Sequence, residues 1–174
     1  MDSDAIRRSL SRIAHEIVER NHGVEGLVVV GVVSHGDVLA RRIATGVSAL
    51  EGVEVPVGVV DPSGHRDDGR SPEPGRPASQ VPDVADRTVV LVDDVIFHGR
   101  TARAAMEALL EFGRPRAIQL AVLIDRGHRR LPIRPDYVGK NVPTSESERI
   151  EVCLQEVEGV DAAVIVQPQG GRRC

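Results

Sequence analysis

The 174-residue sequence is poor in several kinds of residue, and each shortage excludes a class of protein. Two cysteines are too few for a framework of disulfide bonds or a cluster of metal-binding thiolates. No apolar run approaches the roughly 20 residues that cross a membrane, and the charged N-terminus is not a secretion signal, so we expect a cytoplasmic protein. Aromatic residues make up 2% of the chain, so Val, Leu, Ile and Ala must form the core, as in parallel sheets.

Neither sign of charge is in large excess. With 22 basic and 26 acidic residues the formal net charge is −4, which provides no general attraction to nucleic acid. Any nucleic-acid site must therefore be a local basic patch. The length suits one domain with a substantial core, and no internal repeat is visible. We expect residues 1–174 to form a single domain.

Strand and helix patterns alternate along the chain, which predicts an α/β fold with a mostly parallel, twisted sheet flanked by helices. We expect buried strands at residues 27–33, 53–60, 89–92 and 117–124, and shorter strands at 137–139, 149–157 and 161–166. We expect helices at residues 3–21, with Ser3 as N-cap, from 36 to 50, and at 101–112.

Two segments carry no periodic pattern. Residues 61–86 are rich in proline and glycine, which predicts a long flexible loop. Such a loop is either a mobile cover for an active site or an insertion without function. Residues 167–174 are expected to be a frayed end.

The segment from Val89 to Thr101 joins a strand to a helix and contains the adjacent carboxylates Asp93 and Asp94. Two neighbouring carboxylates can accept hydrogen bonds from two ribose hydroxyls. The glycine-containing loop and the helix N-terminus offer N–H groups and a positive dipole end to a phosphate. The pattern therefore favours a sugar-phosphate site, and the alternative is a solvated turn or a helix cap.

A second glycine-containing turn follows the first strand and consists of Ser34, His35 and Gly36. Its N–H groups suit another anion. In doubly wound sheets, turns at the carboxyl ends of strands meet in one crevice where the strand order reverses. We therefore expect the two turns to lie near each other.

Basic residues gather in two segments. In the first helix Arg8, Ser11, Arg12 and His15 are three or four residues apart and share one side. Residues 125–134 form a second, densely basic segment. The alternative to a binding surface is a solvated helix face.

Together these motifs resemble a known family. Residues 90–101 resemble the phosphoribosyl pyrophosphate (PRPP) signature of type I phosphoribosyltransferases. Nearly the whole chain, from Ile6 to Val157, resembles the PyrR family of pyrimidine-operon attenuation regulators, which are also uracil phosphoribosyltransferases. The segments that carry this resemblance are residues 7–16, 113–115, 123–129, 131–134 and 136–145. The resemblance implies the type I phosphoribosyltransferase fold, with a small hood and a flexible loop.

The resemblance also implies roles for individual residues. Asp93 and Asp94 would hold the ribose hydroxyls and, with Arg66, would be the catalytic residues. The ribose 5-phosphate would lie in a cradle formed by Val95, Ile96, Phe97, His98, Gly99, Arg100 and Thr101. Pyrophosphate, with magnesium bound to it rather than to the protein alone, would meet Ser34, His35 and Gly36. The uracil ring would lie near Asp125, Tyr137 and Val138, and residues 65–77 would cover the site.

For the regulatory activity the resemblance implies that pyrimidine-operon leader mRNA binds a basic face, with UMP or UTP as the effector. The residues that would form this face are Arg8, Ser11, Arg12, His15, His128, Arg129, Arg134 and Lys140. Contacts to phosphates and to splayed loop bases suit such side chains. Family members associate as homodimers and higher homo-oligomers, so the same is expected here.

Three histidines depart from the family pattern in the catalytic half. His35 stands where arginine is usual, His98 where threonine is usual, and His65 ends a Pro-Ser-Gly-His segment in place of an extended Thr-Leu-Tyr segment. Losing one positioned donor costs on the order of a hundredfold in rate. We therefore expect RNA regulation to be the main activity and the reaction of uracil with PRPP, giving UMP and pyrophosphate, to be weak.

Other functions are compatible with the same residues. The three histidines are alternatively tolerated variations in a fully active bifunctional enzyme. The chain is alternatively a pyrimidine-salvage uracil phosphoribosyltransferase in the main. A third alternative is a phosphoribosyltransferase for another base, because residues 136–139 also resemble purine-salvage enzymes.

Overall fold

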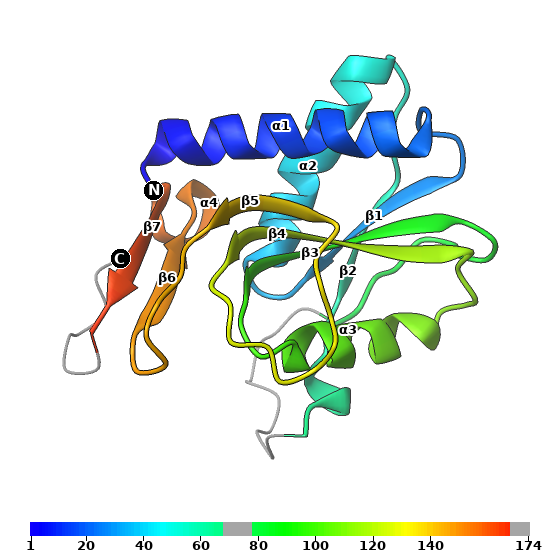
Figure 1. The fold of residues 1–174 in the computed structure, drawn as a ribbon. Helices are drawn as coiled ribbons and strands as arrows, with labels where there is room; N and C mark the ends of the chain where they lie inside the picture. The colour runs from blue at the N-terminus through cyan, green and yellow to red at the C-terminus, as the bar shows by residue number, and fades with distance from the viewer. Residues whose placement is uncertain (68–77, 168–174) are drawn as a thin grey trace.

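The structure is a computed structural model that describes residues 1–67 and 78–167. Its centre is a five-stranded parallel sheet in the order β2-β1-β3-β4-β5 (Figure 1). The strands are β1 (Leu27–Val32), β2 (Val57–Val60), β3 (Thr88–Ile96), β4 (Ala117–Asp125) and β5 (Tyr137–Asn141). The strand order reverses next to β1 and β3, as expected of a doubly wound sheet.

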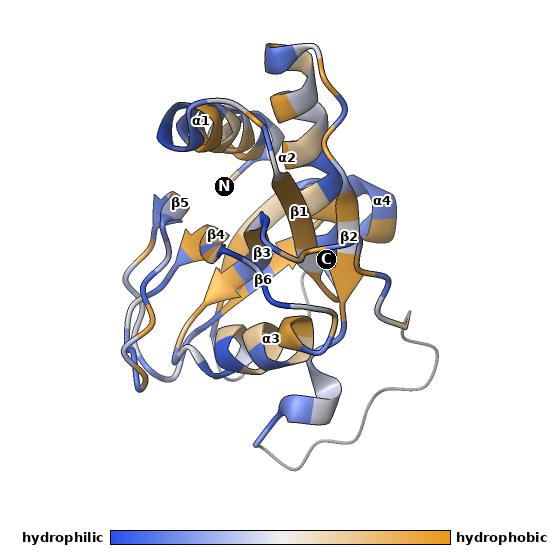
Figure 2. Ribbon diagram, turned by 90° about the vertical axis from the view of Figure 1, so that its right-hand side faces the viewer, coloured by the Kyte–Doolittle hydropathy of each residue, from blue (hydrophilic) through white to orange (hydrophobic). Residues whose placement is uncertain are grey.

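Three long helices cover the sheet, α1 and α2 on one face and α3 on the other (Figure 2). They are α1 (Ser3–Asn21), α2 (Gly36–Glu51) and α3 (Arg100–Leu110). Successive side chains of β3 point to opposite faces of the sheet and so belong to two cores. Val90 packs beneath α1 and α2, and Leu91 packs against α3. The aliphatic composition of the strands therefore reflects burial on both faces.

A small second unit lies beside the start of α1 (Figure 1). Its strands β6 (Arg149–Cys153) and β7 (Ala162–Val166) pair antiparallel, and the short helix α4 (Gln155–Glu158) connects them. We call residues 149–166 the hood. The parallel sheet, the flanking helices and the hood confirm the expected fold class.

Several element boundaries differ from those expected. The N-cap of α1 is Asp2, whose Oδ1 accepts from the N–H of Ala5 at 2.8 Å, so the expectation of Ser3 is wrong. The strand expected to reach Val157 ends at Cys153, because α4 follows it. β3 runs on to Ile96, which places Asp93 and Asp94 inside the strand.

The loop expected at residues 61–86 is only partly described. It contains a short 3₁₀ helix, η1 (Ser63–His65), and Gln80 pairs with Val59. Residues 68–77 of this loop, and residues 168–174 of the expected frayed end, lie outside the described residues. Within the part of the chain that is described, no helix is both long and apolar enough to cross a membrane.

Gly36, the first residue of α2, fixes how the chain leaves β1. A Cβ atom on Gly36 would lie 2.4 Å from the carbonyl oxygen of Val92 and 3.1 Å from Cα of Asp93. Only glycine allows this approach, because real Cβ contacts are not so short. The turn after β1 therefore lies directly against the strand that carries the two carboxylates.

We predict that Gly36→Ala destabilises the fold by about 1–3 kcal/mol, because the added methyl group must displace the backbone of β3. Gly64→Ala is the matched control, since no atom lies within 4 Å of a Cβ placed there. This control is expected to stay within about 0.5 kcal/mol of the wild type. Denaturant unfolding of both variants measures the difference, and equal stabilities would contradict the prediction.

Candidate functional site

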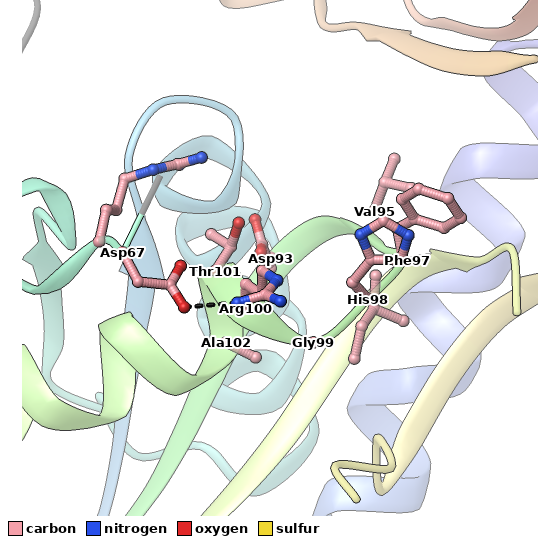
Figure 3. Close-up of a pocket in the computed structure, with 11 residues that line it drawn as sticks. Asp67, Asp93, Val95, Phe97, His98, Gly99, Arg100, Thr101 and Ala102 are labelled. Atoms are coloured by element: carbon pink, nitrogen blue, oxygen red, sulfur yellow. Dashed lines mark hydrogen bonds and ion pairs between the residues drawn. The ribbon is translucent and has the colours of Figure 1, made fainter. Parts of the chain in front are cut away.

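A cavity of about 380 Å³ opens where β3 ends and α3 begins (Figure 3). Residues from three segments line it: Arg66 and Asp67 before the undescribed part of the loop, Asp93 in β3, and residues 95–102. Arg100 and Asp67 form an ion pair with 2.5 Å between Nη1 and Oδ2, which joins the two sides of the cavity. The carboxylate, the loop and the helix start of the expected site therefore share one hollow.

Asp93 is the most perturbed acid in this region. The residue is 8% exposed, and its Oδ1 accepts from the N–H of Asp94 at 3.0 Å. Burial raises the pKa of Asp93 well above its usual value, the charge of Asp94 adds to this effect, and the charge of Arg66 opposes it. Perturbed carboxyl groups in a cleft are candidates for function, because they can exchange hydrogen bonds with a ligand's hydroxyl groups.

The loop between β3 and α3 is shaped to hold an anion. Gly99 adopts φ +89°, in the region that favours glycine, and is the N-cap of α3. The carbonyl oxygens of Phe97 and His98 accept bonds from the 129–131 segment. The first N–H groups of α3 have no partner within the helix, and the positive end of its dipole lies there. The segment expected to form the phosphate cradle is therefore a loop that leads into the N-terminus of α3.

His98 forms part of the cavity wall and stacks on Phe97, with ring centroids 3.7 Å apart. Burial lowers the pKa of His98, and the charges of Arg130 and Arg100 lower it further. The imidazole is therefore uncharged near neutral pH. At this position in the wall, a hydroxyl group or a positive charge would bind an anion more strongly than a neutral ring does.

The turn of Ser34, His35 and Gly36 borders the carboxylate pair. His35 Nδ1 lies 3.5 Å from Oδ2 of Asp94, and His35 Nε2 lies 2.9 Å from Oε1 of Glu158 in the hood. The structure therefore brings together the turn and the two acids, which are about sixty residues apart in the sequence.

Comparison with known proteins agrees with this geometry. Residues 2–156 match the family model described as phosphoribosyl transferase domain. The chain is 55% identical over 172 residues to "Bifunctional protein PyrR" of Deinococcus radiodurans, covering 97% of this chain and 94% of that one. It is 57% identical over 171 residues to the protein of the same name from a Roseiflexus species, covering 96% and 93%. This chain belongs to the PyrR family of phosphoribosyltransferases.

Solved structures show the same fold at lower identity. A hypoxanthine-guanine phosphoribosyltransferase from Bacillus anthracis has a TM-score of 0.64 at 19% identity, covering 82% of this chain and 83% of that one. A hypoxanthine phosphoribosyl transferase from Trypanosoma cruzi has a TM-score of 0.62 at 19% identity, covering 82% and 76%. The type I phosphoribosyltransferase fold is thus shared well beyond the PyrR family.

The three histidines that depart from the PyrR pattern do not all lie in the cavity. His98 lines it, and His35 contacts Asp94 at its edge. His65 instead lies against α3, where Nε2 is 3.2 Å from Oε1 of Glu111 and Nδ1 is 3.9 Å from Oε2 of Glu107. The expectation that three substitutions modify one site is therefore wrong for His65, because η1 turns its ring toward the outer surface of α3.

The residues expected near the base are divided in the structure. Tyr137 is 2% exposed, its hydroxyl donates to Oε1 of Gln119 at 2.8 Å, and burial raises its pKa. The ring of Tyr137 is thus part of the core beneath α1 and is not available to a base, so this expectation is wrong for its side chain. Asp125 and Val138 line a separate hollow of about 450 Å³, together with Arg20, Arg134, Pro135, Asp136 and Asn141.

Most of the expected basic face is at the surface. The exposed members are Arg8, Ser11, Arg12, His15, His128, Arg134 and Lys140. Arg12 joins the two halves of this face, because its Nη2 donates to the carbonyl oxygens of Val138 at 2.9 Å and Gly139 at 2.7 Å. Arg12 therefore lies against β5, whereas Ser11 and His15 line a hollow between α1 and α2.

Arg129 is the exception among the expected basic residues. Its guanidinium donates to the carbonyl oxygens of Phe97, Gly127 and Ile133 and to Oδ2 of Asp125, the last at 2.6 Å. These bonds hold the segment against the phosphate cradle. The guanidinium of Arg129 therefore has a structural role in this segment, and its contact with RNA stays a prediction.

Sequence reasoning missed Arg126. It is 6% exposed, its Nε donates to Oγ1 of Thr144 at 2.9 Å, and its Nη2 donates to the carbonyl oxygens of Ser145 and Glu148. Its guanidinium carbon also lies 3.7 Å from the ring centroid of Phe97. The ring centroids of Phe97 and His128 are 5.7 Å apart, in an edge-to-face arrangement. Its position directly after the buried strand β4 could have indicated that Arg126 is buried. The neighbouring basic residues made it look like one more surface cation.

We predict that His98 lowers stability in acid. Its pKa is lower in the folded than in the unfolded protein, so the unfolded chain binds the proton more readily. The stability associated with the neutral ring is complete above about pH 6.5, the unfolded value, and is lost as the pH falls through the lower folded value. In His98→Thr this contribution to the pH dependence is absent. Unfolding free energies of both proteins at pH 7.5 and 5.0 measure it, and parallel changes would contradict the prediction.

Proposed function

We propose that this chain is bifunctional. One activity transfers the phosphoribosyl group of PRPP to uracil, giving UMP and pyrophosphate. The other binds the leader mRNA of a pyrimidine biosynthesis operon in response to UMP or UTP and attenuates expression, in the cytoplasm. The observation that carries the proposal is the cavity that joins Asp93 to the N-terminus of α3, next to an exposed basic face. The relatives named "Bifunctional protein PyrR" support the assignment of two activities.

In the transfer reaction the bond between the anomeric carbon and the pyrophosphate oxygen breaks, and a bond from that carbon to a ring nitrogen of uracil forms. The nitrogen releases its proton to water, and the pyrophosphate leaves with the electron pair of the broken bond. Asp93 and Asp94 hold the ribose hydroxyls, and the cradle at residues 95–101 holds the 5-phosphate. Ser34, His35 and Gly36 meet the pyrophosphate, so the protein supplies orientation and charge stabilisation.

Magnesium would enter this site on the substrate. Among the described residues there is no group of three or more His, Cys, Asp or Glu side chains that could hold a metal ion. Magnesium commonly binds through substrate phosphates instead of an all-protein cage. When bound, magnesium neutralises charge on the pyrophosphate.

The transferase activity is weak in this proposal because two donors differ from the family pattern. His98 lines the cavity, where burial and the charges of Arg130 and Arg100 lower its pKa. His35 faces Asp94 and Glu158, so both of its nitrogens are directed at carboxylates. Neither imidazole is equivalent to the threonine or the arginine that it replaces.

We predict that His98→Thr and His35→Arg each raise kcat/KM for uracil and PRPP, by about tenfold or more, since one positioned donor is worth up to hundreds-fold in rate. The assay is formation of UMP with magnesium present. His65→Tyr is the control, because His65 lies outside the cavity, and it should leave kcat/KM unchanged. A wild-type rate as high as that of ordinary uracil phosphoribosyltransferases would contradict the weak-activity proposal.

For RNA, the exposed cations beside β5 supply contacts to phosphates, and UMP or UTP in the cavity favours the state that binds RNA. Homodimers or higher oligomers would join two such faces. Asp125 and Val138 remain our candidates for contact with the base, through the backbone or through the hollow that they line.

We predict that Arg134→Ala weakens binding of a pyrimidine-operon leader RNA and reduces the salt dependence of binding by about one counterion, because an exposed phosphate contact is lost. The affinity for UMP should stay unchanged. Arg116→Ala is the matched control, since Arg116 is exposed just before β4, at the opposite end of that strand. Filter binding over a range of salt concentrations, with and without UMP, measures these effects. No RNA binding in either condition would overturn the regulatory proposal.

A further inference from the structure

One contact between the hood and the candidate site is made by the ring of His35. His35 is the N-cap residue of α2, but its side chain makes no capping bond to that helix. Its ring instead lies between Oε1 of Glu158, 2.9 Å from Nε2, and Oδ2 of Asp94, 3.5 Å from Nδ1. The orientation of the imidazole is therefore set by a residue more than a hundred positions away in the sequence.

Glu158 is itself held in place. Its Oε2 accepts from the N–H of Leu154 at 2.8 Å, so both carboxylate oxygens have defined partners. Its side chain is 22% exposed and that of His35 is 18% exposed, so water competes little for the contact between them. The pair is thus a defined contact and not a flexible surface ion pair.

The helix that carries Glu158 is fixed to the main sheet unit. Arg42 of α2 donates to both carboxylate oxygens of Glu156, at 2.9 and 2.5 Å, and to both of Asp161, at 3.0 and 2.7 Å. These bonds raise the pKa of Arg42 and lower those of Glu156 and Asp161. Bidentate pairs of this kind restrict orientation as well as distance. α4 therefore has a fixed position from which Glu158 reaches the turn.

We infer that Glu158 is a positioning residue for the pyrophosphate turn: by accepting a hydrogen bond from Nε2–H of His35, it sets the plane of the ring beside Asp94. This inference rests on the proposed function of the turn. With Nε2 bound to Glu158, the opposite edge of the ring lies beside the reacting centre, where Nδ1 is 3.5 Å from Oδ2 of Asp94. The hood then contributes to the site without touching the substrate.

Binding of two separate ligands tests this role. In Glu158→Gln, the affinity for magnesium pyrophosphate is expected to fall about tenfold, since the bond from Nε2–H to a charged acceptor becomes a weaker bond to a neutral amide. The affinity for inorganic phosphate should stay unchanged, because the cradle at residues 95–101 would bind it without the ribose hydroxyls that Asp94 would hold. Glu54→Gln is the matched control at an exposed position, and it should alter neither affinity. Calorimetry measures both ligands, and Glu158→Asp should recover part of the loss.

A spectroscopic measurement separates positioning from stability. Nitrogen-15 NMR of the His35 ring should show hydrogen on Nε2 bonded to Glu158 in the wild type, and loss of that hydrogen bond in Glu158→Ala. In a His35→Ala background, Glu158→Gln should cause no further loss of pyrophosphate affinity, because it acts through the ring.

The outcomes distinguish this inference from the function on which it rests. Wild-type protein that binds both ligands, with pyrophosphate affinity unchanged in Glu158→Gln, overturns the inference alone. Equal loss of both ligands, or a loss that persists in the His35→Ala background, also overturns it, since either result indicates a structural effect. Wild-type protein that binds neither ligand overturns the proposed function and the inference with it.

Discussion

The arrangement of the site depends on one close backbone contact, between the start of α2 and the carbonyl oxygen of Val92 in β3. Parallel pairing of β1 with β3 brings Gly31 level with Val92, and the missing side chain of Gly36 lets the turn return against the strand. The turn, the acid pair and the first residues of α2 are thereby fixed as one unit. Because α2 also carries Arg42, the hood is attached to the same unit.

Much of the fold was predictable because burial imposes local patterns. Apolar runs identified the five strands of the sheet, and helical spacing identified α1, α2 and α3. The errors lie where two local solutions differ little in energy. Asp2 and Ser3 are both good N-caps, and only the geometry of the chain's entry selects Asp2. The four residues of α4 are too few to produce a periodic pattern, so this segment was indistinguishable from the end of a strand.

The predictability of the site residues also depended on whether their partners are near or far in the sequence. Asp93, Asp94 and the cradle are contiguous in the sequence, so their juxtaposition follows from one strand, one loop and one helix. The orientations of the Tyr137 and Arg129 side chains depend on their hydrogen-bond partners. The hydroxyl of Tyr137 bonds to Gln119, and the guanidinium of Arg129 bonds to backbone carbonyl oxygens. A basic segment gives no sign of which arginines are committed internally. Distant partners such as Glu158 leave no local signature, because their role arises only from packing.

The ring of Phe97 gives the cavity and the basic face a common wall. It stacks on His98 inside the cavity, contacts the buried guanidinium of Arg126, and meets His128 at the surface. Coupling between two ligands is reciprocal by thermodynamic necessity. To the extent that a nucleotide in the cavity changes the affinity for RNA through this ring, RNA changes the affinity for the nucleotide by the same factor. RNA bound at the surface would then slow the release of the nucleotide that promoted its binding.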